Sequence, residues 1–261
     1  MQLLNSIPIS IITINYNDKI GLERTIKSIV NQTYQDFEYL VIDGKSYDGS
    51  VEVLEQYKDH FDYWISEPDT GIYNAMNKGI AKAKGKYLLF INSGDELYSP
   101  TVLEENYSKI HTEDLVYFDL EQVYEDHTNI HHFPLLLSYT NFITGTIGHP
   151  STFIKKELFY KLGPYDEKLK IVADWKFFTW AFIKYHCTTR KIEAVLSKFY
   201  MDGISTKEVD FTNQERRIVL KNDFPEYVRL IELETFVEKL KKSRLIKMLN
   251  SIGLLKSIKN I

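Results

Sequence analysis

Apolar and polar positions along the first hundred residues predict strands and helices in turn. Short apolar runs, typical of buried parallel strands, occupy Ile9–Ile14, Phe37–Ile42, Tyr63–Ile65 and Tyr87–Ile91. Between them, apolar residues at helical spacing predict helices over Leu22–Val30, Val51–Tyr57 and Ala75–Ala83. This alternation predicts an α/β fold, with a mostly parallel central sheet flanked by helices.

The rest of the chain is more mixed. We expect strands near Leu115–Phe118 and Ser151–Ile154 and helices over Lys156–Leu162 and Trp175–Tyr185. The chain becomes helical and polar after Ser205, so we expect one domain over residues 1–205 and a helical extension over 206–261.

The end of the chain is basic and amphipathic. Residues 236–261 contain seven Lys or Arg and one acid, and their apolar residues recur at helical spacing. Such a helix either adsorbs to an anionic membrane surface or packs on the first domain with its basic face in solvent. The pattern leaves both readings open.

Composition narrows the class of protein. With 44% hydrophobic and 26% charged residues among 261, the chain has the balance of a globular protein. The net charge of −4 gives no reason to expect nucleic acid as a partner. The single cysteine, Cys187, excludes an internal disulfide and a cysteine-based zinc cluster. With neither a secretory leader nor an apolar run of about 18 residues, we expect a cytoplasmic protein.

The four amino-terminal strands all run into polar residues. Asn15 and Asn17 follow the first strand, Asp43 the second, Asp69 the third and Asn92–Asp95 the fourth. In open α/β sheets, ligands bind beyond the carboxyl ends of the strands. The sequence therefore predicts one shared, oxygen-rich site at this edge.

In these same segments the sequence resembles the family 2 glycosyltransferases of the GT-A fold, especially the bacterial branch that builds cell-surface polysaccharides. The resemblance covers about residues 8–205 and rests on a series of segments that occur in order: Ser10–Asn17, Gln32–Thr33, Phe37–Gly44, Ser66–Gly79, Phe90–Asp95 and Ala173–Trp175. It implies an inverting enzyme that moves a sugar from a nucleotide-diphosphate sugar, with a UDP-sugar expected, to a hydroxyl of a saccharide or lipid-linked saccharide. It also implies Mn²⁺ or Mg²⁺ as cofactor and allows a peripheral location at the inner face of the cell membrane.

The resemblance assigns roles to particular residues. Those implied to bind the nucleotide sugar are Thr13, Asn15, Tyr16, Asn17, Asp43, Asp69, Tyr73, Asn77, Lys78, Asn92, Ser93 and Gly94. Asp95 is the implied metal ligand, because Asn92–Asp95 stands where relatives carry an Asp-x-Asp motif. Asn92 and Gly94 replace two acids of that motif, and Gly44 stands where many relatives have another aspartate. Asp43 is also explained as a plain turn residue, since Asp-Gly is a common turn pair.

Asp174 matches the catalytic base of the family. The alternative is an N-cap, because a carboxylate often precedes a helix. Trp175 is either an acceptor platform or a core residue. His149 is implied to contact the metal or the diphosphate, although a lone histidine is more often a structural hydrogen-bonding residue.

Two rival functions accompany this interpretation. A degenerate nucleotide-sugar-binding protein would bind a donor without turnover, as the replacements at Asn92 and Gly94 allow. A nicotinamide-dependent oxidoreductase would have a Gly-x-Gly-x-x-Gly turn after the first strand. That turn here reads Asn15-Tyr16-Asn17-Asp18, so the oxidoreductase has no support.

Overall fold

The computed structural model describes residues 9–230, 233 and 236. Backbone contacts divide the chain into two units, Met1–Val209 and Asp210–Ile261, and the sheet lies in the first. The described part of the chain has no helix that is long and apolar enough to cross a membrane. Apart from Phe236, the basic segment 236–261 lies outside the described residues, and the domain boundary after residue 205 stays a prediction.

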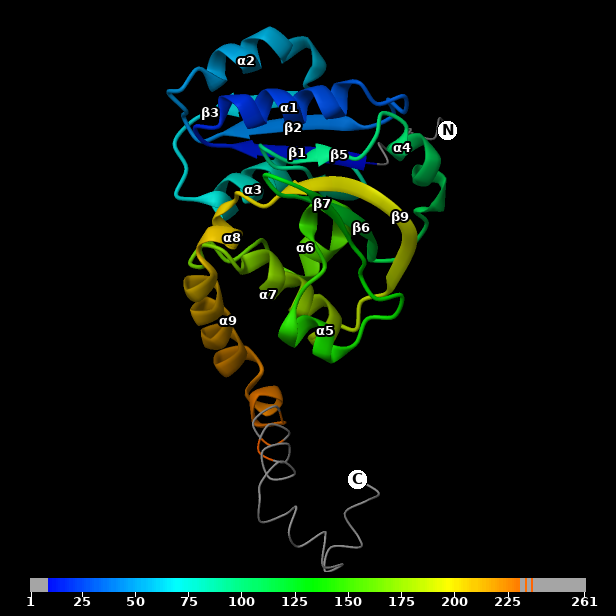
Figure 1. Cartoon of the computed structure of the whole chain (residues 1–261), viewed down its shortest axis with the longest axis vertical. Coiled ribbons are helices and arrows are strands. Elements are labelled where there is room, and N and C mark those ends of the chain that lie inside the picture. The colour runs from blue at the N-terminus through cyan, green and yellow to red at the C-terminus, as the bar shows by residue number, and fades with distance from the viewer. Residues whose placement is uncertain (1–8, 231–232, 234–235, 237–261) are drawn as a thin grey trace, which may run out of the picture. The chain divides into compact units, whose positions relative to one another are not determined.

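A nine-stranded sheet is the frame of the first unit (Figure 1), with the strand order β3-β2-β1-β4-β8-β6-β9-β5 and with β7 paired to β6. The first four strands are parallel: β1 Ile9–Asn15, β2 Glu38–Asp43, β3 Tyr63–Ser66 and β4 Tyr87–Phe90. Their carboxyl ends therefore meet at one edge.

Strand directions are mixed in the second half of the sheet. β8 Thr152–Lys155 is antiparallel to β4, and β6 Leu115–Val123 is antiparallel to β8, so β6 points the same way as β1–β4. β9 Thr189–Tyr200 is parallel to β6 and is the long bent yellow arrow in Figure 1. The short strands β5 Glu96–Leu97 and β7 Thr128–His131 are antiparallel neighbours of β9 and β6. The expected α/β architecture with a mostly parallel sheet is confirmed.

Helices connect the strands. The α-helices are α1 Lys19–Val30, α2 Ser50–Tyr57, α3 Ile72–Lys82, α4 Val102–Asn106, α5 Tyr139–Thr144, α6 Glu157–Leu162, α7 Ala173–Thr179, α8 Ile204–Lys207 and α9 Val209–Asp223. Short 3-10 turns are η1 Lys58–His60, η2 Tyr107–Lys109 and η3 His149–Ser151, and a π-helical segment, η4 Trp180–Lys184, continues α7.

The helices cover both faces of the parallel half. α1 and α2 bury Leu22 and Leu54 in one apolar core with Ile11 of β1. α3 packs on the opposite face, where Gly79 lies against Ile12. A Cβ at position 79 would stand 2.6 Å from Cγ2 of Ile12, so glycine is what lets α3 lie this close to the sheet.

The structure confirms all four predicted amino-terminal strands and the helices between them. Three differences stand out. α3 begins at Ile72, three residues before the predicted start at Ala75, and the helix predicted over Trp175–Tyr185 becomes α7 followed by a π-helical segment. The long strand β9 was not predicted, because its charged residues interrupt the apolar pattern.

Candidate active site

The carboxyl ends of β1, β2 and β3 form one polar network around Asp43. The parallel register places Asp43 between Asn15 and Ser66. Asn15 Nδ2 donates to Asp43 Oδ1 at 2.7 Å, and Ser66 Oγ donates to Asp43 Oδ2 at 2.6 Å. Ser46 donates to both oxygens, through its backbone N–H at 2.9 Å and its hydroxyl at 2.5 Å. The sequence did not single out Ser46.

This network is buried. Asp43 and Thr13 are both 0% exposed, and the Thr13 hydroxyl donates to the Ile91 carbonyl at 2.7 Å. Both side chains therefore support the edge of the sheet from inside. Asn17, in a left-handed conformation with φ 52°, orders the loop by accepting a hydrogen bond from the Tyr47 N–H at 2.9 Å.

Aromatic rings and one carboxylate form the accessible part of this edge. Tyr16 is 63% exposed and Tyr47 is 84% exposed. Asp69 follows β3 and accepts a hydrogen bond from the Gly71 N–H at 3.0 Å. Tyr47, which the sequence did not single out, lies next to Asn17, to which its backbone N–H donates.

Asn77 and Lys78 of α3 hold neighbouring loops. Asn77 accepts from the Tyr165 N–H at 2.9 Å and donates to Glu167 at 2.8 Å. Lys78 donates to the Pro68 carbonyl and pairs with Glu67, both at 2.8 Å. These contacts give both residues a structural role. Asn77 holds the segment that leads into α7, and Lys78 holds the loop after β3.

A tight turn after β4 contains Asn92, Ser93, Gly94 and Asp95. The Asp95 N–H donates to the Asn92 carbonyl at 2.9 Å, and Gly94 has a φ of +100°. Helix α1 supports the turn: the Thr25 hydroxyl donates to the Asp95 carbonyl at 2.6 Å, and Arg24 Nη2 donates to the Gly94 carbonyl at 2.6 Å. Ser93 Oγ donates to Oδ2 of Asp18, the N-cap of α1, at 3.0 Å. Sequence reasoning missed Arg24 and Thr25.

His149 joins this turn to α7, and Tyr73 also contacts α7. His149 Nδ1 lies 2.9 Å from Asp174 Oδ2, and His149 Nε2 lies 3.0 Å from Asn92 Nδ2. The Tyr73 hydroxyl lies 2.8 Å from Asp174 Oδ1 and 2.5 Å from the Ile171 carbonyl oxygen. The structure thus brings together four residues that the sequence placed in the site: Tyr73, Asn92, His149 and Asp174.

Mutual contact shifts the pKa values of His149 and Asp174 in opposite directions. Burial alone lowers the pKa of His149, but the hydrogen bond and charge of Asp174, with the charge of Asp95, raise it above its usual value. Burial alone raises the pKa of Asp174, but the hydrogen bond and charge of His149 and the Tyr73 hydroxyl lower it below its usual value. Asp174 is therefore held ionised, and 15% of its side chain is exposed to an incoming molecule.

The position of Asp174 in α7 differs from the N-cap alternative. The N-cap is Val172, and Asp174 is the second residue of the helix. Its carboxylate lies in the first turn, where the helix dipole favours negative charge. The next residue, Trp175, is 1% exposed and donates its indole N–H to the Phe142 carbonyl at 2.6 Å, so its ring lies in the core.

Asp95 and Asn92 supply the oxygens that a hard cation would use. Asp95 is 6% exposed, and burial, the largest influence, raises the pKa of its carboxyl to about 7. Asn92 Oδ1 is buried and has no hydrogen-bond partner in the described part of the chain. No group of three or more His, Cys, Asp or Glu side chains among those residues is arranged to hold a metal. The donor set fits Mg²⁺ or Mn²⁺ provided that the diphosphate and water supply the other ligands.

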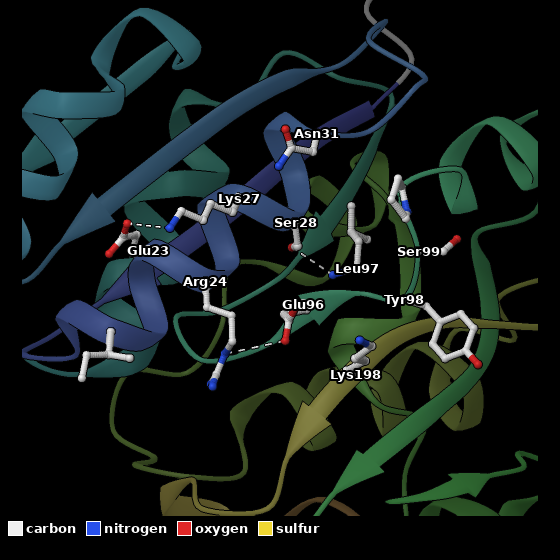
Figure 2. A pocket seen from close by; sticks show the side chains of 12 residues that line it. Glu23, Arg24, Lys27, Ser28, Asn31, Glu96, Leu97, Tyr98, Ser99 and Lys198 are labelled. Atoms are coloured by element: carbon white, nitrogen blue, oxygen red, sulfur yellow. Dashed lines mark hydrogen bonds and ion pairs between the residues drawn. The ribbon is translucent and has the colours of Figure 1, made fainter.

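A shallow pocket of about 510 Å³ lies beside this turn, between α1, β5 and β9 (Figure 2). Two of its cations lie near acids: Arg24 Nε lies 3.8 Å from Glu96, and Lys27 Nζ lies 2.7 Å from Glu23. The Arg24 guanidinium also lies 3.6 Å from the centre of the Tyr200 ring. The described residues that line the pocket do not include Asp174.

Comparisons with known proteins identify the family of the chain. The family described as glycosyl transferase family 2 matches residues 10–163. An uncharacterized glycosyltransferase of Mycobacterium tuberculosis is 34% identical over 206 residues, covering 76% of this chain and 77% of the relative. A PGL/p-HBAD biosynthesis glycosyltransferase of Mycobacterium bovis is 28% identical over 220 residues, covering 77% and 80%.

The fold has a counterpart among solved structures. The crystal structure of S. aureus TarS 1–349 in complex with UDP-GlcNAc superposes with a TM-score of 0.62 at 18% identity, covering 74% of this chain and 58% of that one. This likeness supports the expected GT-A fold. The family match over residues 10–163 and the relative that is 34% identical show that the chain belongs to glycosyltransferase family 2.

Proposed function

We propose that this glycosyltransferase is an inverting enzyme that moves a sugar from a nucleotide-diphosphate sugar to a hydroxyl of a saccharide or lipid-linked saccharide. The observation that carries the proposal is the ionised Asp174 carboxylate, which His149 and Tyr73 hold and which His149 joins to the Asn92–Asp95 turn. A base and a leaving-group site that lie next to each other are what direct displacement requires.

The donor would lie across the carboxyl ends of β1 to β4. Tyr16 and Tyr47 offer exposed aromatic faces to a nucleobase, and the diphosphate would lie toward the turn after β4. TarS has been solved with UDP-GlcNAc, which supports a UDP-sugar for this chain as well. Asp43, Asn15 and Thr13 would shape the site from below without touching the nucleotide.

Asp174 would act as the general base. Its lowered pKa keeps it ionised near neutral pH, so it is ready to take the proton of the acceptor hydroxyl. The acceptor oxygen attacks the anomeric carbon as this proton moves to the carboxylate. The bond from that carbon to the diphosphate oxygen breaks, and the nucleoside diphosphate leaves from the opposite face. One displacement inverts the anomeric configuration.

Asp95 and Asn92 Oδ1 are the residues that would hold Mn²⁺ or Mg²⁺. When bound, such an ion neutralises the negative charge of the departing diphosphate. The Thr25 and Arg24 contacts to the turn fix the backbone that carries both ligands. Arg24 Nη2 donates to the Gly94 carbonyl, and its guanidinium lies near Glu96 and the Tyr200 ring, so Arg24 would position the turn.

The proposed class of acceptor is inferred from the relatives. One relative is named for PGL/p-HBAD biosynthesis, which favours a glycan of the cell envelope or its lipid-linked precursor as the class of acceptor. A cytoplasmic enzyme at the inner membrane face would meet such a precursor, and the basic segment 236–261 would suit adsorption there. Those residues lie outside the described part of the chain, apart from Phe236.

Turnover of a panel of nucleotide sugars with Mn²⁺ or Mg²⁺ tests the proposal, with wild type, Asp174→Asn and the exposed-surface control Asp59→Asn compared. We expect one donor to be consumed, a product of inverted configuration by NMR, and a loss of about a hundredfold or more in kcat for Asp174→Asn alone. Donor binding without turnover across an acceptor screen would support the degenerate binding protein instead. Retained configuration or an active Asp174→Asn variant would refute the assignment of the base.

A further inference from the structure

We propose that Asp69 selects the nucleobase of the donor by accepting a hydrogen bond from a ring N–H of the base. UDP and GDP should therefore bind more tightly than CDP and ADP. This inference rests on the proposed function, because it requires a nucleotide at the carboxyl ends of β1 to β3. It assigns the base contact to Asp69 and not to Asp43.

Asp43 is excluded by its surroundings. Its side chain is 0% exposed, and both oxygens already accept hydrogen bonds from Asn15, Ser46 and Ser66. A base could reach this carboxylate only by displacing donors that hold three strand ends together. Asp43 is therefore structural in this chain.

Asp69 has the acceptor that Asp43 lacks. The side chain is half-buried, and Oδ1 accepts from the Gly71 N–H at 3.0 Å, which fixes the orientation of the carboxylate. Oδ2 receives no hydrogen bond from the part of the chain that the structure describes, so it remains available to a ligand.

The absence of a side chain at Gly44 places this oxygen over the end of β2. A Cβ built on Gly44 would stand 2.5 Å from Asp69 Oδ2 and 3.1 Å from Cδ2 of Tyr16. The carboxylate and the Tyr16 ring thus converge on one point above bare backbone. Any larger residue at position 44 would push them apart.

The Tyr16 ring beside this point, and the exposed Tyr47 on the same edge of the sheet, favour a base over a ribose. Tyr16 and Tyr47 are 63% and 84% exposed, and Tyr47 is tied to Asn17 through its backbone N–H at 2.9 Å. Flat aromatic faces stack on nucleobases with little sequence preference. Selection among bases must then come from a polar group at the edge of the ring, and Asp69 Oδ2 is that group.

The chemistry of the base edge sets the preference. An ionised carboxylate only accepts hydrogen bonds. Uracil presents N3–H and guanine N1–H at the middle of this edge, whereas cytosine N3 and adenine N1 present lone pairs that repel the carboxylate. Cytosine and adenine still carry an amino group one position aside, so we expect discrimination of about tenfold and not exclusion.

Dissociation constants for UDP, GDP, CDP and ADP, measured by calorimetry at fixed Mg²⁺, test the inference in wild type, Asp69→Asn and Asp59→Asn. In Asp69→Asn the amide oxygen keeps the Gly71 N–H and its NH₂ replaces Oδ2. This donor opposes uracil N3–H and suits cytosine N3. UDP and GDP should therefore weaken about tenfold while CDP and ADP do not, and the exposed-surface control Asp59→Asn should match wild type.

Other outcomes separate the alternatives. An equal loss for all four nucleotides in Asp69→Asn would assign Asp69 to the ribose and overturn the inference. Unchanged affinities in this variant, or a wild type that binds all four equally, would overturn it while leaving a nucleotide-sugar enzyme intact. A wild type that binds none of the four would refute the proposed nucleotide donor itself.

Discussion

The imidazole Nδ1 of His149 lies 2.9 Å from Oδ2 of Asp174, although the two residues belong to different elements, η3 and α7. Nε2 of the same ring faces Asn92 in the turn after β4. His149 therefore links the candidate base to the candidate leaving-group site. A substitution of His149 should alter the properties of both.

The first prediction concerns removal of His149. Since His149 lowers the pKa of Asp174, His149→Ala should raise it, because the raising effect of burial remains. The acid limb of the kcat–pH profile should then move to higher pH, and kcat at neutral pH should fall about ten- to a hundredfold. His149→Asn, which keeps an N–H donor, should retain more activity. An unmoved acid limb in His149→Ala would mean that the two groups are not coupled.

The variant Tyr73→Phe should show whether the Tyr73 hydroxyl orients the Asp174 carboxylate or only stabilises the fold. The change removes the hydroxyl that lies 2.8 Å from Asp174 and 2.5 Å from the Ile171 carbonyl. We expect a loss of about 1–2 kcal/mol in the free energy of unfolding and about a tenfold drop in kcat, with a smaller change in the donor KM. Urea unfolding and steady-state kinetics measure the two effects. A stability loss with unchanged kcat would show that Tyr73 only supports the fold.

Much of the amino-terminal half follows from sequence because its signals are local. Each buried parallel strand is a short apolar run with a polar end, so β1, β2, β3 and β4 and the edge they share are visible in the order of residues. β9 is different, since it contains Lys191, whose buried charge is paired with Asp119 of β6. No residue near Lys191 in the sequence indicates that Asp119 is its partner.

The site shows the same division. Motif positions identify Asp43, Asp69, Asp95 and Asp174, but not what each carboxylate does. Asp43 ends β2 and Asp69 follows β3, yet Asp43 is buried with both oxygens hydrogen-bonded whereas Asp69 keeps one oxygen open. The contact of Tyr73 with Asp174 joins residues 101 positions apart. Such differences arise from tertiary contacts, which strand-end patterns do not encode.

Restoring the acids of an Asp-x-Asp motif should be tolerated at Asn92 and should destabilise the protein at Gly94. Gly94 has a φ of +100°, a conformation that strains any residue with a Cβ. Gly94→Asp should therefore cost about 1–3 kcal/mol of stability and reduce activity. Asn92→Asp keeps Oδ1 and puts a second carboxylate oxygen where Nδ2 now faces His149 Nε2, so this variant should fold normally and bind Mn²⁺ more tightly. Thermal melts and Mn²⁺ titrations compare the pair, and a stable, active Gly94→Asp would contradict the strain argument.

Asp95 should make stability depend on pH in the metal-free protein. Burial raises the pKa of its carboxyl from 3.8 to about 7 in the folded state, so the folded protein holds this proton more strongly than the unfolded chain. The Asp95 carboxyl therefore contributes to the free energy of unfolding at acid pH. This contribution is lost as the pH rises from about 4 to about 7, by an amount on the order of 4 kcal/mol. Asp95→Asn cannot lose the proton. The stability of the variant relative to wild type should therefore increase between pH 5 and pH 8, as measured by urea unfolding in a chelator.

Adding metal should reverse this advantage. A cation that binds the ionised Asp95 carboxylate in the folded state stabilises wild type by mass action at pH 8, and the variant lacks that ligand. Millimolar Mg²⁺ or Mn²⁺ should thus raise the midpoint of unfolding of wild type and leave Asp95→Asn nearly unchanged. A pH-independent difference in the chelator would show that the buried carboxyl does not titrate as described. An equal metal response in both proteins would place the cation elsewhere, because Asp95 is the ligand on which this site depends.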